Sequence, residues 1–162
     1  MKEYVSYKNR GMLLEELINK TINFYNQEQI GYFAKNHLNV KFQKENCKNF
    51  SNAFIKNKST VDYYGIYQGK YITFEAKSTE KDYLSFTNIK KHQHDHLQLI
   101  KKLGGIAFYL IFFKNHSLLY RVDVDQINLN NKKRNMSIQD LEKVAVKLDV
   151  IFPGIIDFLD SI

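Results

Sequence analysis

The 162-residue chain is poor in cysteine, proline and tryptophan. Its one cysteine, Cys47, leaves neither a disulfide framework nor a cysteine-ligated zinc site. It has one proline, Pro153, and no proline-rich linker or internal repeat, so we expect a single domain over 1–162 without a hinge. Because tryptophan is absent, the aromatic 14% is all Phe and Tyr, which suits either base stacking or a core.

Long apolar runs are also absent. No run reaches the roughly 18–20 residues of a membrane span, and the longest, 105–113, is predicted as a fully buried strand. The first residues, Met1-Lys2-Glu3-Tyr4, are not followed by the apolar region of a signal peptide. We therefore expect a cytoplasmic protein with no membrane partner. A hydrophobic content of 44% at this length suits one globular domain with its own core.

Acidic residues are outnumbered. The chain has 24 Lys and Arg against 17 Asp and Glu, which gives a formal net charge of +7 and a pI near 9.3. This balance favours an anionic partner, and nucleic acid is the most common one. A solvated, lysine-rich surface explains the same charge, so charge alone does not decide between the two interpretations.

The most informative segment is 60–77, which predicts a β-hairpin. Apolar and polar residues alternate up to Gln68-Gly69 and again beyond it, as in two paired strands joined by a tight turn. With the turn at these two residues, Asp62 lies opposite Glu75, and opposed residues have Cβ atoms roughly 4.5–5.5 Å apart. Two carboxylates this close repel each other unless a cation holds them. The register therefore predicts a divalent-cation site.

The same register places Thr60 opposite Lys77, on the face that Asp62 and Glu75 are expected to share. Phosphodiester hydrolysis requires charge neutralisation at the phosphate, an activated water and a cation near the reacting oxygens. Mg²⁺ suits this chemistry because it keeps several waters and takes one or two carboxylates. In this interpretation Thr60 adds an oxygen ligand, and Lys77 orients the attacking water or offsets transition-state charge. The alternative is an ordinary exposed salt bridge between Glu75 and Lys77, worth about 0–1 kcal/mol.

Hydrophobic periodicity and turn signals divide the rest of the chain into predicted elements. Besides the hairpin at 59–77, strands are predicted over 30–34, 105–113 and 118–124. Helices are predicted over about 13–25, from Ser85 to the Gly104-Gly105 pair, and from Ser137 to about Leu148. The polar, basic segment 36–57 is predicted as mixed or protruding. This order predicts an α/β protein with a mixed sheet and helices packed on it.

A second polar cluster, His92-Gln93-His94-Asp95-His96, lies within the second predicted helix. His92 and His96 are four residues apart, a spacing that places two imidazoles on one helix face for a transition metal. We favour the simpler interpretation, a polar helix surface. Gln93 is expected on the inward side of the helix, where a polar side chain requires a partner such as an active-site cation or the attacking water.

Five blocks of sequence together resemble a known family. The blocks are Asn9-Arg10-Gly11-Met12 with Glu15 soon after, Ser59-Thr60-Val61-Asp62-Tyr63-Tyr64-Gly65, Phe74-Glu75-Ala76-Lys77, His92-Gln93 with His96-Leu97, and Gly104-Gly105-Ile106-Ala107-Phe108. In this order they resemble the RecU family of Holliday junction resolvases, which share the fold of type II restriction endonucleases. The resemblance implies an α/β fold with a restriction-endonuclease-like mixed sheet flanked by α-helices, and a protruding stalk within about 37–58.

The resemblance also implies an activity. The implied protein is a structure-selective endonuclease that resolves four-way DNA junctions by paired, symmetric nicks during recombination and repair. It is implied to act as a homodimer, alongside recombinase and branch-migration proteins. The implied ligands of Mg²⁺, for which Mn²⁺ is expected to substitute, are Thr60, Asp62, Glu75 and Gln93. Lys77 is implied as a catalytic residue together with Asp62 and Glu75, Arg10 as a DNA contact, and Glu15 as a further residue near the metal.

Two regions depart from the family's pattern. The lead before Asn9 is short, and the segment 37–58 is shortened and divergent, with Lys58 where a proline is usual. Two other functions fit the residues. One is a related nuclease that cuts ordinary duplex or damaged DNA, and the other is a non-catalytic nucleic-acid-binding module.

Overall fold

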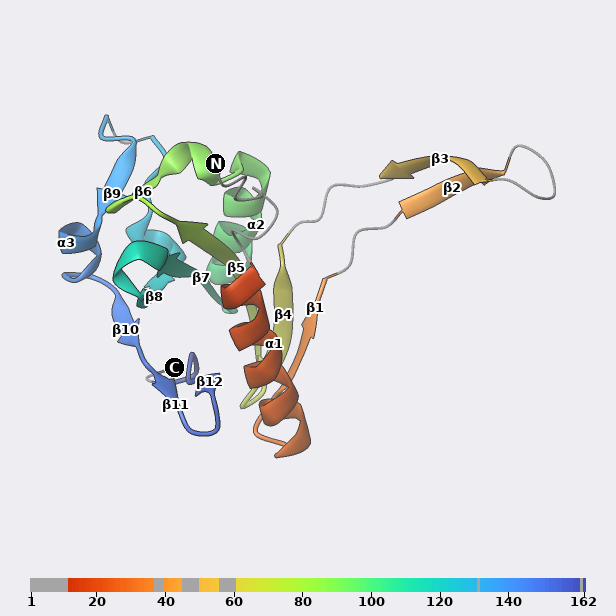
Figure 1. Cartoon of the computed structure of the whole chain (residues 1–162), viewed down its shortest axis with the longest axis horizontal. Coiled ribbons are helices and arrows are strands. Elements are labelled where there is room, and N and C mark those ends of the chain that lie inside the picture. The colour runs from red at the N-terminus through yellow and green to blue at the C-terminus, as the bar shows by residue number, and fades with distance from the viewer. Residues whose placement is uncertain (1–11, 37–39, 45–49, 56–60, 131, 161) are drawn as a thin grey trace, which may run out of the picture.

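The computed structural model describes residues 12–36, 40–44, 50–55, 61–130, 132–160 and 162 (Figure 1). Its largest element is a six-stranded sheet with the strand order β1-β4-β5-β7-β8-β10. The strands of this sheet are β1 (Tyr32–Lys35), β4 (Tyr63–Tyr67), β5 (Lys70–Thr79), β7 (Ile106–Phe113), β8 (Leu118–Asp123) and β10 (Val146–Leu148). β5 and β7 are parallel and the other neighbours are antiparallel, so the predicted mixed sheet is confirmed.

Helices and short strand pairs surround the sheet. The helical elements are α1 (Met12–Gln27), α2 (Lys91–Lys102), α3 (Ile138–Leu141) and the 3₁₀ turns η2 (Phe86–Asn88), η3 (Lys114–His116) and η4 (Val124–Gln126). The strand pairs are β2 (Val40–Lys44) with β3 (Phe50–Ile55), β6 (Tyr83–Ser85) with β9 (Asn135–Ser137), and β11 (Val150–Ile151) with β12 (Ile155–Ile156). No helix in the described ranges is long and apolar enough to cross a membrane.

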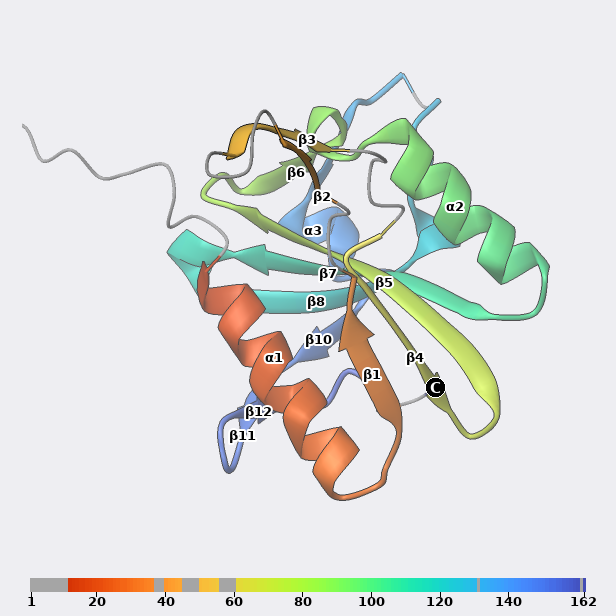
Figure 2. The same ribbon diagram turned by 90° about the vertical axis from the view of Figure 1, so that its right-hand side faces the viewer.

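The two faces of the sheet carry separate hydrophobic cores, and β7 contributes to both. Because side chains alternate along a strand, Phe108, Leu110 and Phe112 pack with α1, whereas Tyr109 and Ile111 pack on the side of α2. This explains why the apolar run is unbroken: a central strand that is covered on both faces has no solvent side. Figure 2 shows α1 and α2 flanking the sheet.

Aromatic rings fix the position of the hairpin strands against β7. Tyr63, Phe74 and Phe108 stack in series, with ring centroids 4.9 and 5.0 Å apart and nearly parallel planes. At Gly65 an added Cβ would lie 2.3 Å from the carbonyl oxygen of Tyr32 in β1, so the close approach of β1 and β4 requires glycine here. The strands that carry the predicted site are therefore held on both sides.

The predicted protruding segment contains a two-stranded antiparallel pair. β2 and β3 pair from Val40 opposite Ile55 to Lys44 opposite Phe50, and Figure 1 shows them projecting away from the main sheet. The ranges 37–39, 45–49 and 56–60 lie outside the described residues.

Two of the predicted helices differ from the structure. α2 begins at Lys91, not near Ser85, because Ser85 caps the short turn η2 and the chain is extended again at Ile89 and Lys90. The capping box at Ser137 and Asp140 is present, but α3 ends at Leu141. The segment that was predicted as helix to about 148 instead forms β10, whose alternating residues complete the edge of the sheet beside β8.

Candidate active site

The β4–β5 hairpin has the predicted turn and register. Gln68 and Gly69 have φ angles of 48° and 75°, the positive values that a tight two-residue hairpin turn requires. The ladder runs from Tyr67 opposite Lys70 to Tyr63 opposite Phe74. Asp62 and Glu75 are the next opposed positions, directly before β4 begins.

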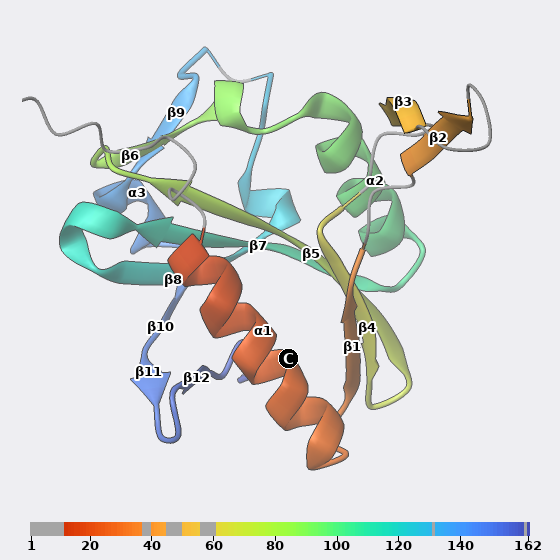
Figure 3. The same cartoon turned by 45° about the vertical axis from the view of Figure 1, so that its right-hand side comes forward.

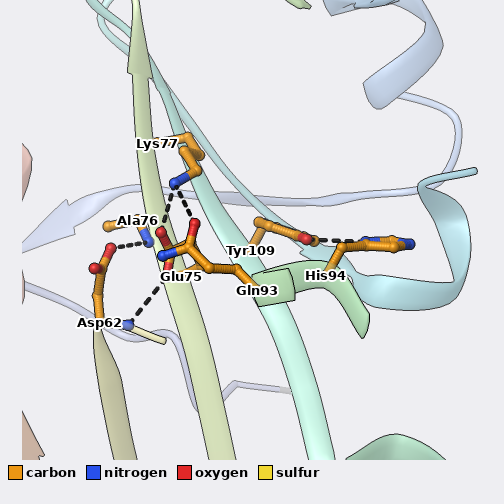
Figure 4. Close-up of polar contacts among 7 residues, drawn as sticks. All are labelled: Asp62, Glu75, Ala76, Lys77, Gln93, His94 and Tyr109. Atoms are coloured by element: carbon orange, nitrogen blue, oxygen red, sulfur yellow. Dashed lines mark hydrogen bonds and ion pairs between the residues drawn. The ribbon is translucent and has the colours of Figure 1, made fainter. Parts of the chain in front are cut away.

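Asp62 interacts with β5 through both its backbone and its side chain (Figure 4). Its N–H donates to Oε2 of Glu75 at 3.0 Å, and its Oδ2 accepts from the N–H of Ala76 at 3.2 Å. The carboxylate of Asp62 therefore reaches across the hairpin to the backbone of β5. Asp62 and Glu75 are thus in direct contact across the hairpin, as the register predicts.

Glu75 is almost fully buried, at 1% exposure, and its charged partner is Lys77. Lys77 Nζ lies 2.5 Å from Oε1 of Glu75 and 3.4 Å from Oε1 of Gln93. The exposed surface salt bridge that was the alternative interpretation does not fit a carboxylate this deeply buried. Side-chain oxygens from β5 and from α2 thus both contact one positive charge, the ammonium group of Lys77.

Burial has a strong effect on the protonation of Glu75. It raises the pKa of this carboxyl to about 7, with Lys77 opposing the shift and the nearby Asp62 carboxylate adding to it. One ammonium group thus does not fully stabilise the negative charge that the two carboxylates bring to this site. A carboxylate pair with raised proton affinity in a partly buried position is a candidate functional site on physical grounds.

Gln93 comes from the first turn of α2 and is 4% exposed, which confirms the expectation that it faces inward. The neighbouring His94 is also buried, and its Nδ1 lies 2.9 Å from the hydroxyl of Tyr109. Tyr109 pairs with Glu75 in the β5–β7 ladder, and burial raises the pKa of the Tyr109 hydroxyl. The His94–Tyr109 bond thus attaches α2 to the strand beside the site.

The histidines of the cluster differ in burial. His94 faces the core, in contrast to the polar helix surface that was favoured, and His92 is exposed. Among the residues that the structure describes, no three His, Cys, Asp or Glu side chains gather closely enough to hold a metal. His94 and Tyr109 were missed as parts of the site, and the only signal in the sequence was a tyrosine inside an otherwise apolar strand.

Asp62 also lines a cavity of about 200 Å³. Glu15 from α1 and Lys35 from β1 form an ion pair and line the same cavity. Two other predicted site residues, Thr60 and Arg10, lie outside the described part of the chain.

The described residues fit a hard divalent cation. Two carboxylates and one amide oxygen are the ligand types that Mg²⁺ accepts, with water completing its shell. Burial, together with the neighbouring Asp62 carboxylate, raises the pKa of Glu75. Side-chain oxygens of Glu75 and Gln93 already contact a cation, the ammonium group of Lys77. Asp62 and Glu75 would therefore hold the ion, and Gln93 would complete the protein ligands.

The comparisons with known proteins identify relatives over nearly the whole chain. Residues 9–162 match the RecU family, described as Recombination protein U. The chain is 43% identical over 152 residues to Holliday junction resolvase RecU of Mycoplasmopsis pulmonis, covering 94% of this chain and 92% of that protein. It is 32% identical over 174 residues to the protein of the same name from Bacillus subtilis, covering 99% of this chain and 83% of that protein.

A solved structure supports the fold class. The chain resembles the 1.6 Å structure of Hjc from Archaeoglobus fulgidus, described as a Holliday junction resolvase, with a TM-score of 0.52 and 8% identity. The similarity covers 82% of this chain and 94% of that one. The expected restriction-endonuclease-like mixed sheet flanked by helices is thereby confirmed. The match over residues 9–162 and the identity to named relatives show that this chain belongs to the RecU family.

Proposed function

We propose that this protein is a divalent-metal-dependent DNA endonuclease that resolves Holliday junctions by paired, symmetric nicks during recombination and repair. The observation that carries the proposal is the convergence of Asp62, Glu75, Lys77 and Gln93 at the open end of the β4–β5 hairpin. The names of the RecU relatives support the substrate. A net charge of +7 supports binding to a polyanion.

The proposed cofactor is Mg²⁺, with Mn²⁺ as a substitute. When bound, the ion would polarise the scissile phosphate and lower the pKa of a bound water. Asp62 and Glu75 are the proposed carboxylate ligands, with Gln93 and Thr60 as further oxygen ligands. The bond from the Ala76 N–H to Asp62 fixes one carboxylate before substrate arrives, which reduces the cost of ordering the site.

The proposed reaction adds water across one P–O bond of the DNA backbone. The water oxygen bonds to phosphorus while the bond to the leaving oxygen breaks, and the leaving oxygen takes up a proton. Lys77 is the proposed catalytic residue, because its ammonium group at the site can stabilise the charge that develops on the phosphate oxygens. Oε1 of Gln93, 3.4 Å from Lys77 Nζ, can accept a hydrogen bond from the attacking water.

Symmetric cleavage of a four-way junction requires two equivalent sites related by a two-fold axis, which is the reason to propose a homodimer. Arg10 is the proposed DNA contact near the start of α1. The proposed setting is the cytoplasm, where recombinase and branch-migration proteins would act on the same junctions.

The β2–β3 pair is proposed to engage the centre of the junction. A two-stranded ribbon that projects from the main sheet can reach DNA beyond the cleaved strand (Figure 1). Replacing 40–55 with a short glycine-serine linker is expected to remove the preference for junctions but leave metal-dependent nicking. An unchanged preference for junctions would assign the ribbon another role.

The proposed function is tested by comparing a four-way junction with a linear duplex of equal length during a Mg²⁺ titration. Paired nicks at symmetry-related positions, found only in the junction, are expected. Equal cutting of both substrates would favour a nuclease for duplex or damaged DNA. Binding without cleavage, with Mg²⁺ and with Mn²⁺, would favour a non-catalytic binding module.

A further inference from the structure

A cavity of about 310 Å³ lies beyond the candidate active site, where β5 ends. Its walls come from the last residues of β5, from β6 with η2, and from the start of η3. These segments meet because β5 and β7 are parallel, so that Thr79 pairs with Phe113 and Lys114 follows directly. Figure 3 shows that the end of β5, β6 and the turn between β7 and β8 lie at the same end of the sheet's strands.

The charge of this cavity favours an anion. Lys81 and Lys114 both line it, and in the described part of the chain no carboxylate lies within ion-pair distance of either ammonium group. Lys81 instead lies over the ring of Tyr83, and Lys114 is half-buried. One acidic residue, Glu80, also lines the cavity and is exposed.

Hydroxyl and amide groups complete the lining. Ser78, Ser85, Thr87 and Asn88 all face the cavity. The hydroxyl oxygens of Ser85 and Thr87 lie 2.8 Å apart, so one of the two hydroxyl groups donates to the other and the second keeps its hydrogen for a ligand. Lysine, serine, threonine and asparagine are the residues that commonly bind DNA phosphates.

The walls are tied together by contacts that do not involve a ligand. Thr79 Oγ1 donates to the carbonyl of Tyr83 at 3.3 Å and accepts from the N–H of Lys81 at 3.1 Å, which fixes the turn after β5. Asn115 Nδ2 donates to the carbonyl of Glu80 at 2.6 Å, which joins this turn to η3. The cavity is therefore largely formed before any ligand binds.

The cavity continues the candidate active site along the same strand. Ser78 lines both this cavity and the one that holds Asp62. Thr79 lies two residues beyond Lys77 on β5, a separation of roughly 7 Å at the rise of a strand. That separation is of the order of one nucleotide step along a DNA strand.

We propose that this cavity binds a backbone phosphate of the cleaved DNA strand, one or two nucleotides from the bond that is hydrolysed. Lys114 and Lys81 neutralise the phosphate, and the Ser85–Thr87 pair donates a hydrogen bond to it. The inference rests on the proposed function, because it takes the Asp62–Glu75 site as the point of cleavage. A phosphate held here would fix the register of the strand without reading its sequence.

The test combines Lys114→Gln with junctions that carry a single neutral methylphosphonate. The modification is moved through the three phosphates on either side of the cleaved bond, and binding is measured by fluorescence anisotropy without metal. For the wild type, we expect neutralisation at one position within two nucleotides of that bond to weaken binding severalfold. Lys114→Gln should weaken binding to unmodified DNA by a similar factor, and it should cause no further loss when the methylphosphonate is at that position. The slope of the logarithm of the binding constant against the logarithm of salt concentration should fall in magnitude by about one.

The matched control is Lys20→Gln, which removes an exposed lysine of α1 that lines none of the described cavities. Its effect should add to that of the methylphosphonate at every position. Effects of Lys114→Gln that also add at every position would overturn the phosphate site.

Cleavage of the unmodified junction by the wild type with Mg²⁺ is measured in parallel. If the wild type cleaves the junction but the effects of Lys114→Gln and of the methylphosphonate add at every position, the phosphate site is overturned and the nuclease stands. If Lys114→Gln and one methylphosphonate are coupled but the wild type cleaves no DNA, the cavity still binds a phosphate, and both the nuclease and the placement of that phosphate beside a hydrolysed bond are overturned. A wild type that binds no DNA would overturn both.

Discussion

The backbone N–H of Asp62 donates to Oε2 of Glu75 at 3.0 Å, so the residue directly before β4 holds the buried carboxylate of β5 in place. This contact does not depend on the side chain of Asp62. The two roles of Asp62, positioning Glu75 through its backbone and offering its own carboxylate, can therefore be separated by mutation.

Asp62→Asn is expected to lose cleavage by a factor on the order of a hundred to a thousand or more, because it removes one of two carboxylates from the site. The backbone donor remains, and the new amide oxygen can still accept from the N–H of Ala76. Thermal unfolding and metal-free junction binding should therefore change little. Unchanged cleavage would exclude Asp62 from the site, whereas loss of folding would show a structural role.

Lys77→Met separates the ammonium group's effect on catalysis from its effect on Glu75. Lys77 is the main influence that lowers the pKa of Glu75, so the variant should bind metal more weakly at neutral pH. Raising the pH ionises Glu75 and should restore metal affinity, but turnover should stay low because the charge near the phosphate is missing. Recovery of turnover together with affinity would mean that Lys77 acts only through Glu75.

Tyr109→Phe tests the attachment of α2 to β7. The variant leaves the buried Nδ1 of His94 without its partner, which is expected to cost about 1–3 kcal/mol in the free energy of unfolding. The metal dissociation constant should rise because Gln93 is then less well positioned. Tyr120→Phe is the matched control, since it removes another tyrosine hydroxyl, bonded to Glu142 at 3.3 Å, and should leave metal binding unchanged. Equal effects of both variants on metal affinity would contradict a positioning role for Tyr109.

Glu75 makes the stability of the metal-free protein depend on pH. Its pKa is about 7 when folded and near its usual 4.5 when unfolded, so the folded state binds more protons between these values. The free energy of unfolding should therefore fall as the pH rises from about 4.5 to about 7, by as much as about 3 kcal/mol. Denaturant unfolding at several pH values measures this slope. Glu75→Gln should remove it, and an identical slope in the variant would assign it to other groups.

The hairpin, β7 and α1 could be predicted because local patterns determine them. Gln68-Gly69 suits a turn with two positive φ angles, and the apolar run of β7 requires burial on both faces. The start of α2 was harder to predict, because Ser85 is an equally good cap for the short turn η2. The length of the last helix depended on the free edge of β8, a partner distant in sequence.

Some contacts among the proposed site residues could be predicted, but their geometry could not. Register alone brought Asp62 and Glu75 together, but strand alternation could not show that Asp62 leaves the ladder and binds the N–H of Ala76. The partnership of His94 with Tyr109 joins a helix to a strand through the core, and no local pattern encodes it.

Binding of Mn²⁺, followed through the electron paramagnetic resonance signal of the free ion, tests most directly whether the two carboxylates form one cation site. Asp62→Asn and Glu75→Gln are compared with the wild type and with Glu28→Gln, which alters an exposed carboxylate after α1. We expect the wild type and Glu28→Gln to remove free Mn²⁺ equally, and the two site variants to remove far less. Equal binding by all four proteins would contradict a metal site at Asp62 and Glu75.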